Sequence, residues 1–499
     1  MARTLMIQGT GSHVGKSVLT AALCRIFRRR GVAVAPFKSQ NMSNNSYATP
    51  DGREIGRAQA VQAMACGLEP RTDFNPVLIK PSSDVSAQLV MNGRVAGTLQ
   101  ARDFGRVRRD CWPAVEAAFA RLSVEFDLIV LEGAGSPAEV NLRDADIVNM
   151  HMAAHARAPV LLVGDIDRGG VLASIVGTVA LLTPEERRHL KGFIVNKFRG
   201  DPALLTPGLD IVTARTGLRS LGIVPFWRGA RLPEEDAVDW AFTASDRHHC
   251  ERLTIGVVEV PCVSNATDLE ALAGEPDVRL VPVRDGSADT ALDALIFPGS
   301  KNTPQALTFV REHGIDRLAK EIIARGGLVI GLCAGYQLLG EGLADPEGIE
   351  SASRELRGLG LLDIDTRFRA DKTTRQVSAI HRASGLSVRG YEIHMGETSI
   401  GDRMRPVFEV QLPDGGTRPD GASSPDGLVW GTYLHGVFDQ PEFRRAILNG
   451  LRDKRGWPSL SPSPDTGLEK RLDAWADFVA EHIEIDAIER IMMAGIGPV

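Results

Sequence analysis

The chain has 499 residues, which predicts roughly two to four domains, each with a hydrophobic core of its own. Hydrophobic residues make up 43% and charged residues 24%, so the composition excludes a disordered chain and a fibre. The formal net charge is −6, which excludes a global positive field for nucleic acid or anionic lipid. No apolar run approaches the roughly 18 residues that would span a bilayer.

The cysteine pattern favours a reduced compartment. The cysteines are scattered, and they form neither a CxxC pair nor a Cys/His cluster with zinc spacing. The apolar start at residues 1–7 leads into a glycine-rich turn without a cleavage-site pattern. We therefore expect a cytoplasmic, water-soluble enzyme without a disulfide framework. The six cysteines are Cys24, Cys66, Cys111, Cys250, Cys262 and Cys333.

Two series of short apolar runs are separated mostly by longer, helix-like stretches. This alternation favours an α/β fold with two open, mostly parallel sheets covered by helices. A polar stretch between the series predicts a boundary near residue 250. We expect a first domain at 1–250, a second at 251–450, and a helical extension at 451–499 packed on the second domain. The strand candidates are 4–7, 32–34, 127–131, 159–163 and 191–195, then 253–260, 294–297, 327–330 and 427–430.

A glycine-rich segment at 9–17 follows the first predicted strand and precedes a helix-like run. Small residues such as Gly9 and Gly15 let backbone N–H groups surround phosphate oxygens at a helix N-terminus. Lys16 is then expected to reach the β- and γ-phosphates, and the hydroxyl of Ser17 to bind the magnesium ion that bridges them. Five residues separate the two outer glycines here, one more than in the usual phosphate loop. This longer form, which includes Thr10, resembles the loop of dethiobiotin synthetases and cobyrinate amidases, which use ATP to phosphorylate a carboxylate.

Two further strand ends carry candidate nucleotide-site residues. Glu132 ends a buried strand, where ligands of open α/β sheets collect, and it is a second candidate for holding the magnesium ion. Asn196 and Lys197 end another predicted strand. Their pairing resembles the adenine-reading Asn-Lys of the same superfamily.

A second motif, GLCAGYQ at 331–337, follows the predicted strand at 327–330 and opens a helix-like run. A cysteine on such a tight turn is exposed, and the nearby helix N-terminus favours the thiolate. Cys333 is therefore the candidate nucleophile. His435, about a hundred residues downstream after a later strand, is the candidate base.

These segments resemble class I glutamine amidotransferases, in which a cysteine attacks the side-chain amide of glutamine. The resemblance implies that the N–H groups of Ala334 and Gly299 stabilise the oxyanion and that Gln337 helps to bind glutamine. Many members carry a glutamate two residues after the histidine, but this chain has Val437 there. The third member of the triad is thus absent or replaced, and Glu392 and His394 are candidates for supplying its support.

The segments 36–47, 52–59 and 75–81 are rich in amide side chains, which suit a ligand with many carboxylates and carboxamides. With 133–139, 196–201, 298–303 and 390–396, they resemble the cobyric acid synthase family. The resemblance implies ATP- and glutamine-dependent amidation of the b, d, e and g carboxylates of adenosylcobyrinic acid a,c-diamide. It also implies ATP with Mg²⁺ as the substrate complex, no tightly bound prosthetic group, and small-molecule partners only, without nucleic acid or membrane. The substrate residues implied by position are Lys38, Gln40, Asn41, Asn45 and Asp146.

Three alternatives remain open at this stage. A sister enzyme that amidates the a and c positions of cobyrinic acid shares both domains but should lack the amide-rich segment at 40–45. A ParA-like nucleotide switch would have no use for Cys333. The second domain could also be a relic that no longer hydrolyses glutamine. The order of the amidations, the ammonia path and the formation of a homo-oligomer are not determined by the sequence.

Overall fold

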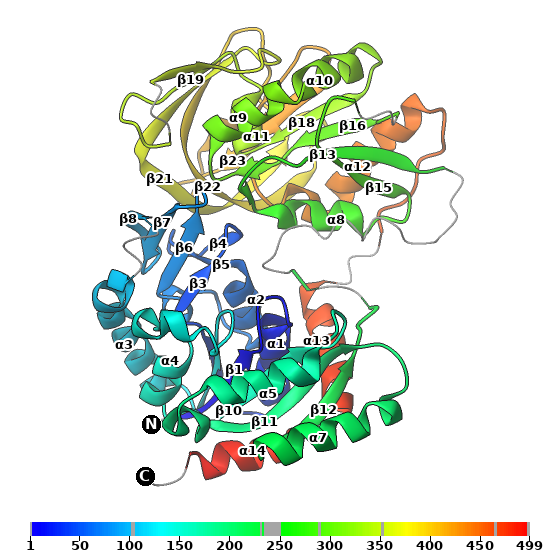
Figure 1. The fold of residues 1–499 in the computed structure, drawn as a ribbon. Helices are drawn as coiled ribbons and strands as arrows, with labels where there is room; N and C mark the ends of the chain where they lie inside the picture. Colours follow the sequence, from blue (N-terminus) through cyan, green and yellow to red (C-terminus); the bar gives the residue numbers. More distant parts are fainter. Residues whose placement is uncertain are drawn as a thin grey trace.

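The computed structural model describes residues 2–100, 105–229, 232–233, 251–287, 291–350, 354–463 and 467–496. The first domain, lower in Figure 1, is built on a six-stranded sheet in the order β12-β11-β10-β1-β9-β2, in which every neighbouring pair is parallel. The strands are β1 (Arg3–Gly9), β2 (Val34–Phe37), β9 (Leu128–Glu132), β10 (Val160–Asp165), β11 (Leu190–Phe198) and β12 (Arg219–Pro225). The helices are α1 (Lys16–Arg29), α2 (Arg57–Ala65), α3 (Val107–Glu125), α4 (Met150–His155), α5 (Val171–Leu181), α6 (Pro184–Arg187) and α7 (Thr206–Thr216), with the 3-10 turns η1 (Thr72–Phe74), η3 (Val140–Ala145) and η4 (Pro202–Leu204).

The second domain repeats this plan with a sheet in the order β15-β13-β16-β18-β26-β25, parallel except at β25. Its strands are β13 (Leu253–Val258), β15 (Val278–Val283), β16 (Ala294–Phe297), β18 (Leu328–Leu332), β25 (Ala422–Ser423) and β26 (Val429–Thr432). Its helices are α8 (Glu270–Ala273), α9 (Thr303–Glu312), α10 (Ile315–Ala324), α11 (Ala334–Leu338) and α12 (Pro441–Lys454), with the turns η6 (Ala266–Leu269) and η7 (Val437–Asp439). The two sheets confirm the predicted α/β fold. The predicted boundary residue, 250, lies outside the described residues.

Each domain also carries smaller sheets that the sequence analysis did not predict. In the first, β3 (Gln40–Met42), β6 (Val77–Pro81), β7 (Ser86–Met91) and β8 (Arg94–Gln100) form one sheet, and β4 (Ser46–Ala48) pairs with β5 (Glu54–Gly56). In the second, the long hairpin of β21 (Ile364–His381) and β22 (Ser387–Ile400) joins β19 (Gly342–Ala344), β20 (Glu355–Arg357), β23 (Phe408–Gln411) and β24 (Thr417–Asp420), and β14 (Val263–Ser264) pairs with β17 (Gly299–Ser300).

The C-terminal extension is divided between the two domains, so its predicted placement is wrong. Helix α12 packs in the second domain, where Phe443 and Leu448 join the core. Helices α13 (Leu468–His482) and α14 (Ile485–Ala494) instead pack on the first domain, beside α1 and β12 (Figure 1). Their apolar face belongs to the core cluster that covers β1, and Trp475 Nε1 donates to the carbonyl of Val18 at 2.7 Å. The apolar face indicates that these helices are buried but does not indicate against which domain.

The two domains meet where the β21–β22 hairpin reaches the small sheets of the first domain (Figure 1). A small apolar cluster there joins Ala48 to Tyr391 and Ile393, with Tyr47 beside it. Polar contacts also join the domains. Hydrogen bonds run from the ammonium of Lys372 to Glu54, from Gln376 Nε2 to the carbonyl of Ala48 at 3.1 Å, and from Asn302 Nδ2 to the carbonyl of Ser82 at 3.2 Å.

Among the residues that the structure describes, no helix combines the length and the apolar character needed to cross a membrane.

The placement of the extension predicts the effect of truncating Trp475. We expect Trp475→Ala to lower the free energy of unfolding by about 3–5 kcal/mol, because a large buried ring leaves a cavity. Hydrogen exchange should rise in α1 and β1 of the first domain and remain unchanged in the second. The control is Val124→Ala, since Val124 is 91% exposed. Faster exchange in the second domain instead would contradict this packing.

Candidate functional site

The phosphate-binding loop of the first domain connects β1 to α1. Gly15 has φ 96°, a left-handed conformation that favours glycine, and a Cβ there would lie 2.2 Å from Nδ2 of Asn196. A Cβ on Gly9 would lie 2.9 Å from Nζ of Lys16. The backbone N–H of Thr10 donates to the carbonyl of Val163 on β10, which ties the loop to the sheet. Both outer glycines are therefore required by close packing.

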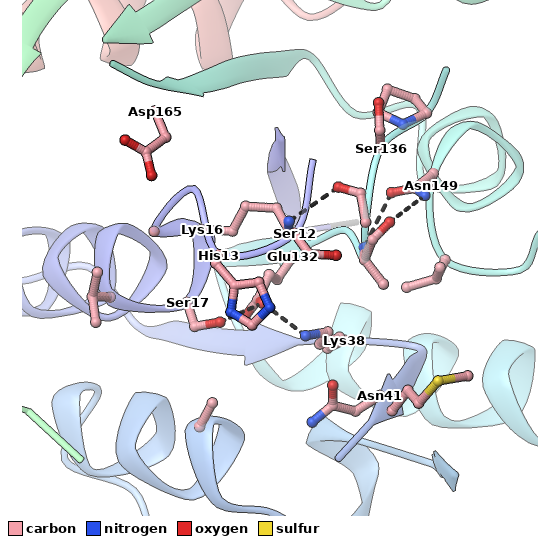
Figure 2. Close-up of a pocket in the computed structure, with 18 of the residues that line it drawn as sticks. Ser12, His13, Lys16, Ser17, Lys38, Asn41, Glu132, Ser136, Asn149 and Asp165 are labelled. Atoms are coloured by element: carbon pink, nitrogen blue, oxygen red, sulfur yellow. Dashed lines mark hydrogen bonds and ion pairs between the residues drawn. The ribbon is translucent and has the colours of Figure 1, made fainter. Parts of the chain in front are cut away.

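Glu132, at the carboxyl end of β9, is the centre of a buried network below this loop (Figure 2). Its Oε1 accepts hydrogen bonds from Ser17 Oγ at 2.7 Å and from Lys38 Nζ at 2.8 Å. Its Oε2 accepts one from Gln62 Nε2 at 2.6 Å. Burial raises the pKa of the Glu132 carboxyl, but the Lys38 ammonium and these hydrogen bonds outweigh burial, so the pKa lies below its usual range. Glu132 is therefore ionised at neutral pH.

The oxygens of Ser17 and Glu132 fit a magnesium ion by their chemistry. Mg²⁺ prefers hard oxygen ligands and is usually held by one or two protein groups together with phosphate oxygens. The Ser17 hydroxyl and the Glu132 carboxylate lie 2.7 Å apart beside the loop, so both can face one ion. Lys38 neutralises the carboxylate in this structure.

Lys16 projects from the start of α1 and hydrogen-bonds the carbonyls of Gly11 at 2.8 Å and Gly135 at 3.0 Å. Its ammonium thus joins the phosphate loop to the loop that follows β9 (Figure 2). Both loops line one cavity with a volume of about 810 Å³, which is large enough for a nucleotide-sized ligand.

Asn196 and Lys197, at the end of β11, hold the same loop from the other side. Asn196 Nδ2 donates to the carbonyl of Val14 at 2.9 Å, and Lys197 Nζ donates to the carbonyl of His13 at 2.6 Å. Lys197 also pairs with Asp165 at 3.1 Å. Both residues line the cavity, so their predicted contact with the nucleotide remains a prediction that their position allows.

Four of the five residues predicted to bind the substrate line this cavity, namely Lys38, Gln40, Asn41 and Asp146. Gln40 and Asn41 lie on β3, and Asn41 Nδ2 donates to Gln59 Oε1 at 2.9 Å. Asp146 also lines the cavity, but both of its carboxylate oxygens accept from backbone N–H groups at the start of α4. In this structure Asp146 therefore stabilises the local backbone.

Asn45 is not among the residues that line this cavity, unlike the other four predicted substrate residues. It is buried at the domain interface, where its Oδ1 accepts a hydrogen bond from the backbone N–H of Ala266 at 3.0 Å. The reason is local, because the chain turns away from the cavity after β3 and enters β4, which faces the second domain.

Cys333 of the second domain occupies the turn between β18 and α11 with φ 51°, a strained conformation for a side chain with a Cβ. The glycines beside it are required by crowding. A Cβ on Gly331 would lie 2.7 Å from the backbone of Gly335, and one on Gly335 would lie 1.9 Å from the carbonyl of Phe297. This is the sharp strand-to-helix turn that presents a nucleophile.

His435 is fully buried after β26, and Cys333 lies close enough to influence the pKa of its ring. Its Nδ1 is 2.6 Å from Oδ2 of Asp268, and the other oxygen of that carboxylate accepts from the N–H of Gly436 at 2.8 Å. Burial lowers the pKa of the imidazole, but the charge and hydrogen bond of Asp268, with a smaller contribution from Cys333, raise it to about 10. The Asp268 carboxylate therefore favours the protonated form of the His435 ring.

The acid that orients His435 is thus Asp268, and the predicted support from Glu392 and His394 is wrong. The Glu392 carboxylate is bound by Arg375 and Arg418. His394 Nδ1 bonds the carbonyl of Gly396 at 2.8 Å, and burial lowers the pKa of this ring to about 4. Val437, where many relatives of class I have the acid, is buried in the core instead.

The residues predicted to bind the oxyanion and glutamine surround Cys333. Ala334 is the first residue of α11, and a Cβ on Gly299 would lie 3.7 Å from Cε1 of His435, so both predicted donors flank the nucleophile. Gln337 is buried, accepts from Thr303 Oγ1 at 3.1 Å and donates to Tyr433 Oη at 3.2 Å. Its side chain therefore joins α11 to α9 and to the strand end before His435.

Sequence reasoning missed Asp268, Asn265, Gln62 and Asp165. Gln62 follows Gln59 by three residues on α2, the spacing that places two side chains on one helix face. Asp165 ends β10, so it shared the strand-end signal of Glu132. Asp268 and Asn265 lie in an irregular turn without a motif, and only the folded chain shows their contact with His435.

Comparison with known proteins matches both domains to described families. The family model described as "CobQ/CobB/MinD/ParA nucleotide binding domain" matches residues 5–237, and the one described as "CobB/CobQ-like glutamine amidotransferase domain" matches residues 254–443. Three curated relatives share the name cobyric acid synthase. The protein of Rhodobacter capsulatus is 49% identical, with 97% of this chain and 98% of the relative covered. The protein of Salmonella typhimurium is 46% identical with full coverage of both chains, and that of Syntrophobacter fumaroxidans is 45% identical, with 98% of this chain and 99% of the relative covered.

These relatives extend over both domains at well above 30% identity, whereas a nucleotide switch of the ParA kind would account for the first domain alone. The chain belongs to the cobyric acid synthase family, whose members combine a nucleotide-binding domain with a glutamine amidotransferase domain.

Proposed function

We propose that this enzyme converts the b, d, e and g carboxylates of adenosylcobyrinic acid a,c-diamide to carboxamides, using ATP and glutamine at each step. The observation that carries the proposal is the presence, in one chain, of a phosphate loop above the buried Glu132 network and a Cys333–His435–Asp268 triad. The first can activate a carboxylate, and the second can release ammonia. Either site alone would leave the reaction incomplete.

The first step takes place in the cavity of the first domain. A substrate carboxylate oxygen attacks the γ-phosphorus of ATP, which forms an acyl phosphate and releases ADP. Lys16 and the N-terminus of α1 stabilise the negative charge of the transferring phosphoryl group. A magnesium ion held by Ser17 and Glu132 would neutralise charge on the phosphates. The Lys38 ammonium, which is hydrogen-bonded to Glu132, keeps the Glu132 carboxylate ionised.

The second step takes place at Cys333. The thiolate attacks the side-chain amide carbon of glutamine, and the N–H groups of Ala334 and Gly299 stabilise the oxyanion. Protonated His435 gives its proton to the leaving nitrogen, so that ammonia departs and a thioester remains. Water then hydrolyses the thioester to glutamate, with His435 as the base that accepts the water proton.

Ammonia completes the reaction by attacking the acyl phosphate, which forms the amide and releases inorganic phosphate. Free ammonia in water at neutral pH is mostly protonated and does not react. Transfer inside the protein avoids protonation and also protects the acyl phosphate from water. The contact between the domains at β4, β21 and β22 supports such a transfer.

The two sites should be separable by mutation. We expect Lys16→Ala to lower amidation about 100-fold or more with any nitrogen source, since it removes a charge that stabilises phosphoryl transfer. Cys333→Ala should lose amidation with glutamine and keep it with ammonium chloride. The product mass after incubation with the a,c-diamide, ATP and Mg²⁺ measures both effects.

The control for this experiment is Cys262→Ala, which removes a different thiol of the same domain. It should retain both activities. Amidation with glutamine by Cys333→Ala at the wild-type rate would overturn the proposal for the second domain. Amidation of the a and c carboxylates of cobyrinic acid would instead favour the sister enzyme.

Asp268→Asn tests the triad. The amide cannot supply the negative charge that holds His435 protonated and oriented, so we expect glutamate release to fall by at least about 100-fold. Amidation with ammonium chloride should stay within about twofold of the wild type. The matched control is Glu392→Gln. Glu392 is a buried acid on β22 whose carboxylate is bound by Arg375 and Arg418 instead of His435. A larger loss in Glu392→Gln than in Asp268→Asn would contradict the assignment.

The same variant gives a pH dependence of stability. The pKa of His435 is raised to about 10 in the folded protein, so its stabilising contribution is complete below the unfolded value near 6.5 and is lost as the pH rises through about 10. The difference in free energy of unfolding between wild type and Asp268→Asn should therefore narrow from pH 7 to pH 10, by at most about 1.4 kcal/mol per pH unit. Denaturant titrations at several pH values measure it, and a constant difference would contradict the raised pKa.

A further inference from the structure

A short segment of the second domain, Asn265–Asp268, contacts both ring nitrogens of His435. Asp268 lies at Nδ1, and Nδ2 of Asn265 is 3.1 Å from Nε2, the nitrogen that must serve Cys333. Both side chains are buried. The position of this one segment therefore determines the orientation of the ring and the environment of its reactive nitrogen.

The start of this segment is held by the first domain. The backbone N–H of Ser46 donates to Oδ1 of Asn265 at 3.1 Å, and Oδ1 of Asn45 accepts from the backbone N–H of Ala266 at 3.0 Å. The four residues are buried, so these hydrogen bonds do not compete with water. Asn265 also has φ 52°, a left-handed conformation that asparagine adopts more readily than most residues, and the contacts on either side hold it there.

The Ser46 contact also determines which end of the Asn265 amide faces His435. Because Oδ1 is occupied by the Ser46 N–H, the amide nitrogen is directed at Nε2. The amide nitrogen can donate to Nε2 only in the state in which His435 has passed on its Nε2 proton, whereas a turned amide would present its oxygen to the protonated ring. A displacement of Ser46 therefore changes the hydrogen bonding of the catalytic imidazole.

The segment that makes these contacts is continuous with the wall of the ATP cavity. Gln40, Asn41 and Met42 on β3 line that cavity, and the chain reaches Asn45 three residues later. A ligand that moves β3 would thus move Asn45 and Ser46 against the histidine segment of the other domain.

We propose that Asn45 is a positioning residue for the glutaminase site, supplied by the synthetase domain, and that it links the state of the ATP cavity to His435 through Asn265–Asp268. This inference rests on the proposed function, because it assumes that Cys333 and His435 hydrolyse glutamine. Asn45 acts through the segment that contacts the ring of His435.

The test uses the full chain with Asn45→Ala, and with Gln376→Ala as the matched control. Gln376 also makes a hydrogen bond across the interface, to the carbonyl of Ala48, but not to the histidine segment. Three quantities are measured: glutamate release with the a,c-diamide and ATP present, amidation with ammonium chloride, and the pH profile of Cys333 alkylation by iodoacetamide, followed on the peptide that contains Cys333.

We expect Asn45→Ala to lower the kcat of glutamate release about tenfold or more, to shift the alkylation profile, and to keep amidation with ammonium chloride within about twofold. Gln376→Ala should change none of them more than about twofold. Asn45→Asp keeps an oxygen that can accept from Ala266 and should recover part of the activity, including where Asn45→Ala does not fold.

Equal effects of Asn45→Ala and Gln376→Ala would overturn the inference, as would an equal loss of the ammonium-dependent activity, which would return Asn45 to the synthetase reaction. If the wild type releases no glutamate, the proposed function fails. In that case an alkylation profile unchanged by Asn45→Ala overturns the inference separately, and a shifted profile supports the contact.

Discussion

The hydrogen bond between Asp268 and His435 is the interaction on which the second site depends. An imidazole buried as completely as this one would lose its proton to burial if no carboxylate were present. Asp268 supplies the charge, and through the N–H of Gly436 it also fixes the backbone next to the ring. Asp268 lies on a short turn whose start is hydrogen-bonded to Asn45 of the first domain. The catalytic geometry of the second domain therefore depends on the position of the first.

The phosphate-binding loop and the turn that carries Cys333 share one backbone feature, which a different residue type provides in each. Each leads from the end of a parallel strand into a helix through a residue with positive φ, which directs backbone N–H groups toward a ligand. In the first loop this residue is Gly15, because the amide of Asn196 fills the space that a Cβ would need. In the second it is Cys333, because the side chain itself must project. The cost of the strained cysteine is about 1–2 kcal/mol, and the flanking glycines keep the turn free of further clashes.

Much of this could be predicted from the sequence, and the limits have physical reasons. Both loops, Glu132 and His435 follow buried strands, and strand ends of parallel sheets are recognisable from apolar runs followed by glycine or polar residues. Asp268 carries no such signal, because its partner is 167 residues away and its own turn has no repeat or spacing. The prediction of where α13 and α14 pack was wrong for a related reason. An amphipathic pattern indicates that one helix face is buried but not which domain covers it. Asn45 faces the second domain rather than the cavity that Asn41 lines, because residues four apart in an irregular segment can point to different surfaces.

The interface that joins the sites is specified by polar groups rather than by apolar area. Glu54 is bound by Lys80 of its own domain and Lys372 of the other, and the carboxylate is almost completely buried. The two lysines outweigh the effect of burial, so the pKa of Glu54 lies well below its usual range, whereas burial lowers the pKa of Lys80 to about 8. Buried ion pairs add little net stability, but loss of Lys372 would leave Oε2 of this buried carboxylate without its donor, while Lys80 still pairs with Oε1. Such a junction favours one register of the two domains over nearby alternatives, because a shift that separates Lys372 from Glu54 has a large penalty. A single register is what a reaction with a diffusible intermediate requires, since ammonia can be delivered efficiently only if the second site keeps a fixed position relative to the first.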